Sequence, residues 1–275
     1  MSTRTKLQRY LNPDGSLKDE QQVTLGGSSE AIKSDVDFWV STQSSAEDRA
    51  QQLHDIAKLV DTTLFRAYMY ASPSLAGPLF RIDNFCDPDA VNEKLLETSR
   101  YNDLVDFFYG KKLHNQALAL LKRFGDRDEE EEAAPQLFGP RRTVAYLQNL
   151  PPEMIDLILD FARWPLERDR ELGMEVFLAD TENAETLPRV KVLDFLQDID
   201  RKLEVQYLEH IISELNDKTP SFHQRMADIY IQGLKTDDFE SEEQRRLWKD
   251  KALEFLRDSK DYQAYKALKK LPPDG

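Results

Sequence analysis

The stretch Leu203-Glu-Val-Gln-Tyr-Leu-Glu-His-Ile-Ile-Ser-Glu-Leu215 decides the fold class of this chain. Its apolar side chains recur at i, i+3, i+4 and i+7, which is the spacing of one face of an α-helix. These side chains are Leu208, Ile211, Ile212 and Leu215. The side chains that we place on the opposite, solvent-facing side are Glu204, Glu209, Ser213 and Glu214. The pattern predicts an amphipathic α-helix with one buried face.

The composition of the whole chain points the same way. Leucine outnumbers valine and isoleucine combined, and unbranched side chains lose less rotamer freedom in a helix than β-branched ones do. No segment shows the period-two alternation of a strand, and 10 glycines are too few for a protein built on tight β-turns. We therefore predict an all-α fold.

Helix starts are marked by local signals. Asp87-Pro88 places an acidic N-cap before a proline at the first helical position, and Thr219-Pro220 repeats this arrangement. Ser241 and Gln244 have the spacing of a capping box. With the periodicity, these signals predict helices at 46–70, 88–98, 101–110, 113–124, 141–148, 152–164, 168–179, 188–199, 201–216, 220–233, 241–258 and 261–271.

The predicted helices are joined by short turns, so each should lie antiparallel to the next. The helix at 152–164 is apolar on more than one face, as expected for a helix packed between two neighbours. The aromatic-bearing segments 104–110 and 226–233 each precede a helix with an Ala-Leu pair. These features predict an α-solenoid of antiparallel helix hairpins, of the clathrin heavy-chain or tetratricopeptide-like kind.

We expect four parts along the chain. Residues 1–45 are polar and partly flexible, residues 46–124 form a first helical region, residues 125–140 form an acidic loop, and residues 141–275 continue the helical solenoid. Within the first part, the apolar patch Asp37-Phe-Trp-Val40 is expected to dock on the solenoid.

Charge and cysteine content exclude several classes of protein. The 37 Lys and Arg against 51 Asp and Glu give a net charge of −14, which disfavours nucleic acid as the main partner. The single cysteine, Cys86, excludes a disulfide framework and a multi-cysteine zinc site, and it fits a reducing compartment. The sequence shows no transmembrane segment and no signal peptide, so we expect a soluble intracellular chain. Its abrupt end at 271–275 suggests a fragment.

The search for catalytic or metal-binding motifs is negative, so we predict no enzyme, no cofactor and no metal site. The four histidines, His54, His114, His210 and His223, fall in different predicted helices or helix starts. His210 and Glu214 share a helix face, but two ligands do not make a metal site, and a solvated pair is the favoured interpretation. The helix start at Asp87 would lower the pKa of the Cys86 thiol. We favour the alternative, a buried small apolar side chain.

Two side-chain clusters remain as candidate binding features. The aromatic stripe Tyr101, Phe107, Phe108 and Tyr109 is interpreted as core rather than as a ligand box. The acidic run places six carboxylates in seven positions, and a solvated loop is its favoured interpretation. Its functional alternative is a docking site that attracts a basic partner surface. The candidate residues for such a site are Asp126, Asp128, Glu129, Glu130, Glu131 and Glu132.

Several ordered blocks resemble the first characteristic domain of the vacuolar protein sorting-associated protein 39 family. The resemblance covers most of residues 46–235, and the acidic insertion and the Gly/Ser stretch suggest a fungal-type member. The blocks that carry it are Val60-Asp-Thr-Thr-Leu-Phe-Arg-Ala-Tyr-Met-Tyr70, Leu79-Phe-Arg-Ile-Asp-Asn-Phe-Cys-Asp87, Glu93-Lys-Leu-Leu-Glu97, Tyr101 to Lys122, Arg142-Thr-Val-Ala-Tyr-Leu-Gln148, Glu171-Leu-Gly-Met-Glu-Val-Phe177, Thr186 to Leu196, and Tyr207-Leu-Glu-His-Ile-Ile212.

The resemblance implies a subunit of HOPS, the multisubunit tether of late endosomes and the vacuole or lysosome. It implies as partners the other HOPS subunits, a late-endosomal or vacuolar Rab GTPase bound directly or indirectly, and organelle-membrane proteins at contact sites. It implies a cytoplasmic chain, peripheral on the late endosome or vacuole membrane. We expect neither the family's β-propeller nor its second characteristic domain within these residues, so functions of those parts are not transferred.

We therefore expect a non-catalytic scaffold and protein-docking segment that acts as a rigid spacer. The alternative is a vesicle-coat or trafficking adaptor that binds peptide in a concave groove, which requires aromatic and basic residues facing outward from successive repeats.

Overall fold

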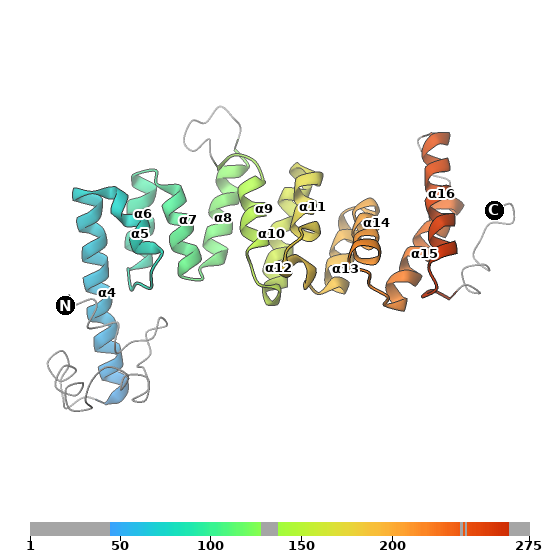
Figure 1. Cartoon of the computed structure of the whole chain (residues 1–275). Helices are drawn as coiled ribbons and strands as arrows, with labels where there is room; N and C mark the ends of the chain where they lie inside the picture. Colours follow the sequence, from blue (N-terminus) through green and yellow to red (C-terminus); the bar gives the residue numbers. More distant parts are fainter. Residues whose placement is uncertain (1–44, 128–136, 237–238, 240, 264–275) are drawn as a thin grey trace. The chain divides into compact units, whose positions relative to one another are not determined.

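The computed structural model describes residues 45–127, 137–236, 239 and 241–263 (Figure 1). Within these ranges the chain forms thirteen α-helices, α4 to α16, and no strand. Neighbouring helices pack in pairs along the chain. The all-α solenoid predicted from the sequence is confirmed. The chain divides into two compact units, residues 1–138 and 139–275.

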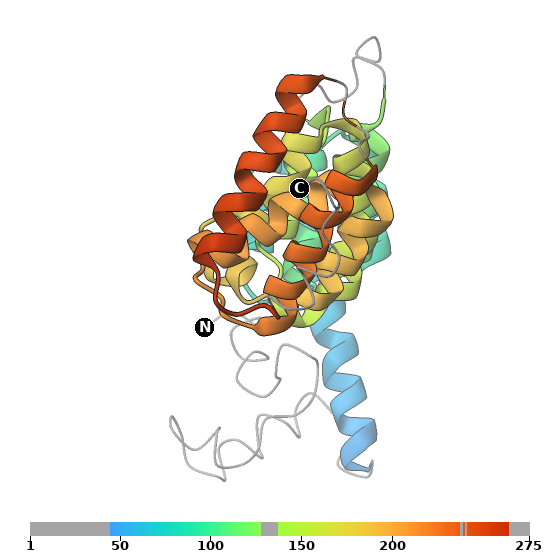
Figure 2. The same ribbon diagram turned by 90° about the vertical axis from the view of Figure 1, so that its right-hand side faces the viewer.

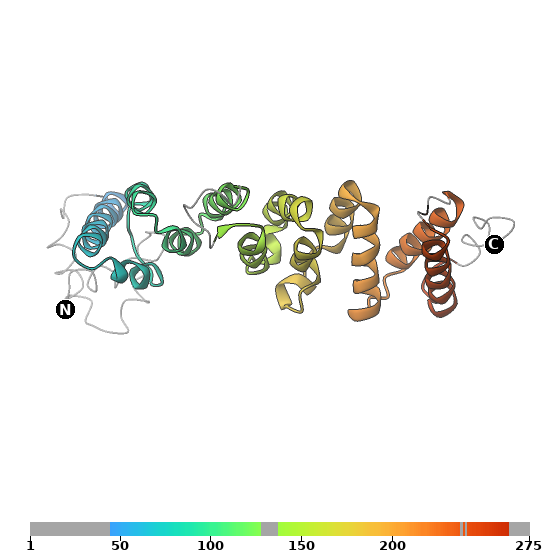
Figure 3. The same cartoon turned by 90° about the horizontal axis from the view of Figure 1, so that it is seen from above.

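The first unit contains five α-helices and one 3-10 turn in its described part. In chain order they are α4 (Ala46–Ala71), η2 (Pro73–Leu75), α5 (Ala76–Phe80), α6 (Pro88–Glu97), α7 (Tyr101–Gly110) and α8 (His114–Gly125). α7 packs on α5, α6 and α8, and Figure 3 shows α6, α7 and α8 nearly end-on. The turns after α6 and α7 contain the left-handed residues Ser99 (φ 53°) and Lys112 (φ 57°). These short turns make successive helices antiparallel.

Helix α4 is the longest element of this unit, with 26 residues. It begins in a capping box, because the Ser45 side chain accepts from the Asp48 amide and the Asp48 side chain accepts from the Ser45 amide. Its N-terminal half extends past the other helices of the unit (Figures 1 and 2). Farther along, Phe65 anchors the helix against Phe80, whose ring centroid lies 5.6 Å away.

Three members of the aromatic stripe are core residues, as predicted. Tyr101, Phe107 and Phe108 are all buried. The ring of Phe107 lies 4.9 Å from that of Phe80, centroid to centroid, and these rings fill the space between α5 and α7. The fourth member, Tyr109, is 44% exposed, because it lies on the side of α7 that turns away from this packing.

The second unit contains eight α-helices in its described part. They are α9 (Arg141–Gln148), α10 (Ile155–Arg168), α11 (Arg170–Leu178), α12 (Glu182–Glu185), α13 (Arg189–Ile199), α14 (Arg201–Glu209), α15 (Pro220–Thr236) and α16 (Glu242–Asp258). A 3-10 turn, η4 (Pro152–Met154), precedes α10, and a π-helical turn, η5 (His210–Glu214), follows α14. The most extensively packed pairs are α10 with α11, α13 with α14, and α15 with α16.

The helix that decided the fold class differs from its prediction in two respects. The α-helix ends at Glu209, and residues 210–214 continue as the π-helical turn, after which Asn216 turns the chain with φ 49°. Glu204, which we placed on the solvent side, is 1% exposed. That placement was wrong because Arg225 of α15 covers this side of α14 and hydrogen-bonds the carboxylate.

Local signals predicted helix starts better than helix ends. Asp87 caps α6, with its side chain accepting from the amides of Asp89 and Ala90, and Ser241 caps α16 by accepting from Gln244. By contrast, α10 does not stop before Pro165 but contains it and continues to Arg168. The proline has no amide hydrogen to donate, yet its carbonyl still accepts from Asp169.

Some predictions fall outside the described residues. They include the apolar patch at 37–40 and all but the first three residues of the helix expected at 261–271. The four-part division of the chain stays a prediction. No helix of the described ranges has both the length and the apolar composition needed to cross a bilayer.

Candidate functional site

The acidic run is represented in the described residues by Asp126 alone. It is the exposed C-cap of α8, and its amide donates to the carbonyl of Lys122. The other five carboxylates, at 128–132, lie outside the described residues. The docking role of this run stays a prediction.

Two of the four histidines have structural contacts in the first unit. His54 meets Phe85 edge-on at 5.7 Å, and His114 meets Tyr109 edge-on at 5.5 Å. Burial lowers the pKa of His114 below its usual value. The described residues contain no group of three or more His, Cys, Asp or Glu side chains arranged to hold a metal ion.

Cys86 is buried, as the favoured interpretation predicted. It belongs to the segment between α5 and α6, which polar side chains of α4 hold by hydrogen bonds. The Asp61 carboxylate accepts from the Phe85 amide at 2.8 Å, and the Thr62 hydroxyl accepts from the Asp87 amide at 2.9 Å. The Cys86 thiol donates to the Asp61 carbonyl at 3.4 Å. These contacts satisfy buried backbone groups, so the cluster is an anchor for the chain.

Lys111, at the end of α7, completes this anchor from the other side. Its ammonium donates to the Asn84 carbonyl and lies 6.0 Å from the Phe85 ring centroid and 5.8 Å from that of Phe107. Burial lowers the pKa of Lys111 below the usual lysine value, and nearby Asp61 partly offsets the effect. No sequence pattern pointed to this lysine, because only the fold places a helix C-cap against a distant loop.

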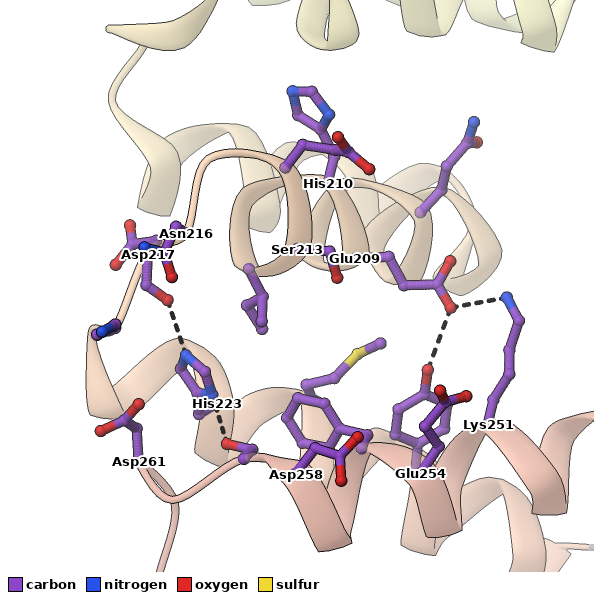
Figure 4. Close-up of a pocket in the computed structure, with 18 of the residues that line it drawn as sticks. Glu209, His210, Ser213, Asn216, Asp217, His223, Lys251, Glu254, Asp258 and Asp261 are labelled. Carbon is purple, nitrogen blue, oxygen red and sulfur yellow. Dashed lines mark hydrogen bonds and ion pairs between the residues drawn. The ribbon is translucent and has the colours of Figure 1, made fainter.

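A concave site of the second unit lies between α14 with its π-helical turn and the hairpin of α15 and α16 (Figure 4). We call it the α14–α16 cleft; its volume is about 930 Å³. Its apolar lining residues are Leu178, Ile212, Met226 and Phe255. Its charged lining residues are Glu209, Glu214, Asp217, Lys218, Lys251, Glu254, Asp258, Lys260 and Asp261. With six carboxylates and three ammonium groups, the lining has a formal charge of −3.

One end of the cleft is built around His223 of α15, which is 5% exposed. Its Nε2 lies 2.7 Å from the Asp217 carbonyl, and its Nδ1 lies 2.6 Å from the Ser259 hydroxyl (Figure 4). A carbonyl only accepts, so Nε2 carries the hydrogen and Nδ1 of the neutral ring accepts from the hydroxyl. Burial lowers the pKa of His223, while Asp261 partly offsets this effect. His223 therefore ties the turn before α15 to the end of α16.

The opposite end is held by Glu209, the last residue of α14. Its carboxylate accepts from the Tyr230 hydroxyl at 3.1 Å and from the Lys251 ammonium at 2.8 Å (Figure 4). Burial, and then the charge and hydrogen bond of Glu209, raise the pKa of Tyr230. A neutral phenol therefore joins α15 to α14, and the ammonium joins α16 to the same carboxylate.

Carboxylates follow one side of the cleft along α16 and the residues after it. Glu254 and Asp258 lie one turn apart, and Asp261 follows the end of the helix (Figure 4). Asp258 pairs with its neighbour Arg257 at 2.8 Å, whereas the carboxylates of Glu254 and Asp261 make no ion pair or hydrogen bond with the described residues. We call these three residues the acidic lip.

His210 and Glu214, which the sequence placed on one helix face, both line this cleft as the first and last residues of the π-helical turn. The sequence pattern indicated this pair but none of the other groups. The apolar spacing at 208–215 stays regular, so no local signal marked the π-helical turn, a feature that is frequent at functional sites.

The cleft places charged groups around an apolar floor, and at one end of it the Ser259 hydroxyl donates to Nδ1 of His223. The fold and the site thus define a helical-hairpin solenoid with a charged cleft beside its last described hairpin.

Comparison with known proteins gives the family. Residues 60–166 match the family model described as vacuolar sorting protein 39 domain 1. The chain is 32% identical over 80% of its length to vacuolar morphogenesis protein 6 of Schizosaccharomyces pombe and 32% identical over 80% to the human Vam6/Vps39-like protein. It is 27% identical over 84% to vacuolar morphogenesis protein 6 of Saccharomyces cerevisiae. The chain belongs to the Vam6/Vps39 family of vacuolar sorting proteins.

The chain spans about a quarter of the length of these relatives, with 25% of the fission yeast protein, 26% of the human protein and 22% of the budding yeast protein covered. No solved structure matches the chain significantly.

Proposed function

We propose that this chain is a non-catalytic scaffold and protein-docking segment of a HOPS-type tethering subunit that acts in fusion at the late endosome and the vacuole or lysosome. The observation that carries the proposal is the match of residues 60–166 to domain 1 of vacuolar sorting protein 39. The helical-hairpin architecture supports it, because stacked hairpins hold distant binding sites at a defined separation.

The implied partners are the other subunits of the tether and a late-endosomal or vacuolar Rab GTPase, bound directly or through those subunits. Membrane proteins at organelle contact sites are a further class of partner. The place of action is the cytoplasmic surface of the late endosome or vacuole. The anchors at Asp61, Thr62 and His223 support a spacer role, because each ties a connecting segment to a neighbouring helix.

The test is a pull-down with the purified chain at low and at physiological salt. The baits are the Rab GTPase loaded with GTP or with GDP, the individual tether subunits, and a detergent extract of organelle membranes analysed by mass spectrometry. Capture of a tether subunit or of the GTP-loaded Rab supports the proposal. Capture of coat components instead would favour the adaptor alternative, and a folded chain that captures nothing would contradict a docking role.

A further inference from the structure

We propose that the α14–α16 cleft binds an amphipathic segment of a partner protein, with an apolar side chain seated between the helices and lysine or arginine side chains paired with the acidic lip. This inference deepens the proposed function and rests on its docking role. The occupant is a basic, amphipathic peptide segment rather than a small molecule or a nucleic acid.

The size and apolar lining of the cleft favour a segment of chain. Its volume of about 930 Å³ lies near the upper end of the roughly 300–1,000 Å³ of ligand pockets. Ile212 and Phe255 are half-buried, so the floor leaves aliphatic and aromatic surface open to a ligand, while Met226 is buried. Such a surface suits an apolar side chain of a helix laid into the groove.

The charges that line the cleft determine which charge the bound segment should carry. Glu254 is exposed and Asp261 is half-buried, and each is left without an ion pair among the described residues. On the facing side, the Glu209 carboxylate is already occupied by Tyr230 and Lys251. Free negative charge therefore remains on the α16 side, where flanking cations of a ligand would pair with it. Lys218 and Lys260 also line the cleft, and they would repel a segment whose cations reach beyond the lip.

Polar contacts at both ends of the cleft fix the positions of its walls, so the opening is a feature of the folded unit. His223 fixes one end through Asp217 and Ser259, and Glu209 fixes the other through Tyr230 and Lys251. Helix α14 contacts α15 much less than α15 contacts α16. A preformed groove reduces the cost of ordering when a ligand binds.

The experiment measures fluorescence anisotropy of a labelled probe peptide titrated with the purified chain. The probe carries leucines at i, i+3, i+4 and i+7 and lysines on both flanks. Its controls are the same peptide with glutamates for the lysines, and a scrambled peptide of equal composition. We expect the lysine probe to bind and both controls to bind at least about ten-fold more weakly.

Two variants of the chain locate the binding. The lip variant Glu254→Lys/Asp258→Lys/Asp261→Lys should weaken probe binding about ten-fold and remove most of its salt dependence. Its matched control reverses three exposed carboxylates outside the cleft, Glu153→Lys/Asp160→Lys/Glu167→Lys, and should bind within about two-fold of the original chain.

A second variant blocks the groove with a bulky side chain. Ser213 is an exposed lining residue (Figure 4), so Ser213→Trp should prevent probe binding, whereas Ser74→Trp in the first unit should not.

Several results would overturn the inference. An equal loss of probe affinity in the lip variant and in its charge-matched control would show non-specific attraction to an acidic protein. Tight binding of the scrambled or glutamate peptide would refute the stated ligand chemistry. A concentration-dependent dimer that Ser213→Trp dissolves would assign the cleft to a second copy of the chain.

The inference about the cleft and the proposed function can be contradicted independently of each other. If the chain captures tether subunits and Ser213→Trp captures them equally well while probe binding is absent, the cleft inference fails and the docking function stands. If the probe binds in the cleft but no tether subunit or Rab is captured, the proposed function fails and the cleft inference stands.

Discussion

Arg225 of α15 reaches back to Glu204 of α14, with its Nε 2.5 Å from the glutamate Oε1, and so joins two consecutive helix hairpins of the second unit. The same guanidinium donates to Asp194 of α13 at 2.8 Å and to Gln197 at 3.3 Å. One side chain therefore connects three helices. Because Glu204 is 1% exposed while Arg225 stays partly exposed, the carboxylate depends on this arginine for compensation of its charge.

Removing the arginine should be strongly destabilising. Arg225→Ala leaves the Glu204 carboxylate buried and unpaired, and we expect a loss of about 3 kcal/mol in the free energy of unfolding. Urea denaturation measures it. Arg170→Ala is the control, because its ion pair with Asp200 is at the surface and should contribute less than about 1 kcal/mol. Equal losses in the two variants would contradict the role assigned to Glu204.

Thr62, which anchors the segment between α5 and α6, should contribute more to the stability of the fold than its neighbour Thr63. Thr62→Val removes the acceptor of the Asp87 amide and should cost about 1–3 kcal/mol, because a partly buried donor is left unpaired. Thr63→Val, at the adjacent exposed position, should change stability by less than about 0.5 kcal/mol. Thermal unfolding followed by circular dichroism measures both. A larger effect at position 63 would refute the anchor.

The packing of α15 on α16 requires glycine at position 233. A Cβ there would lie 2.6 Å from Nε1 of Trp248, whose indole donates to the Tyr230 carbonyl at 3.1 Å. Gly233→Ala should therefore destabilise the fold by about 1–3 kcal/mol, although alanine is the better helix former. In the double variant Gly233→Ala/Trp248→Leu the two losses should be less than additive. Strict additivity would place the strain elsewhere.

Stability should fall in mild acid through His223. Burial holds its pKa below the unfolded value of roughly 6.5. At pH values above this unfolded pKa, the ring is neutral in both the folded and the unfolded chain, and its full contribution to the free energy of unfolding is present. As the pH falls from about 6.5 towards the lowered pKa of the folded state, the unfolded chain takes up the proton first, and stability is lost. In urea denaturation from pH 7.5 to 5.5, His223→Gln should lose less stability than the original chain.

His114 provides the comparison, because burial lowers its pKa as well. The variant His114→Gln should remove only its own share of the pH dependence. A pH profile that His223→Gln leaves unchanged would show that His223 binds its proton equally in the folded and unfolded chain.

The acidic run should act through long-range attraction if it recruits a partner. Neutralising its six carboxylates, at 126 and 128–132, to Asn and Gln should abolish the salt dependence of partner association while the free energy of unfolding stays the same. Surface plasmon resonance at several salt concentrations measures the association rate. An unchanged rate and an unchanged salt slope would leave the run as a solvated loop.

Much of the architecture could be predicted from local sequence. The N-cap at Asp87 and the proline at position 88 start α6 as expected, because these residues satisfy free helix donors without help from the rest of the fold. Helix ends were less predictable. Pro165 stays inside α10, where the packing of neighbouring Trp164 and Leu166, both buried, outweighs the missing hydrogen bond.

The binding surface was far less predictable than the helices. The acidic run is visible as a charge pattern, whereas the α14–α16 cleft combines residues from four parts of the chain, from Leu178 to Asp261. No short-range pattern connects Glu209 with Lys251, which are 42 positions apart. Such pairs form only after the hairpins have packed.

The sequence by itself determined the all-α class, the positions of most helices and the relation to the Vam6/Vps39 family, because periodicity, caps and ordered sequence blocks are properties of short segments. The tertiary structure alone decided that Glu204 is buried, that a π-helical turn replaces the last turn of the predicted helix, and that a cleft opens beside it. The physical reason is that burial and charge pairing depend on which helix covers which face, and Arg225 of the next hairpin covers a face that the local pattern assigns to solvent.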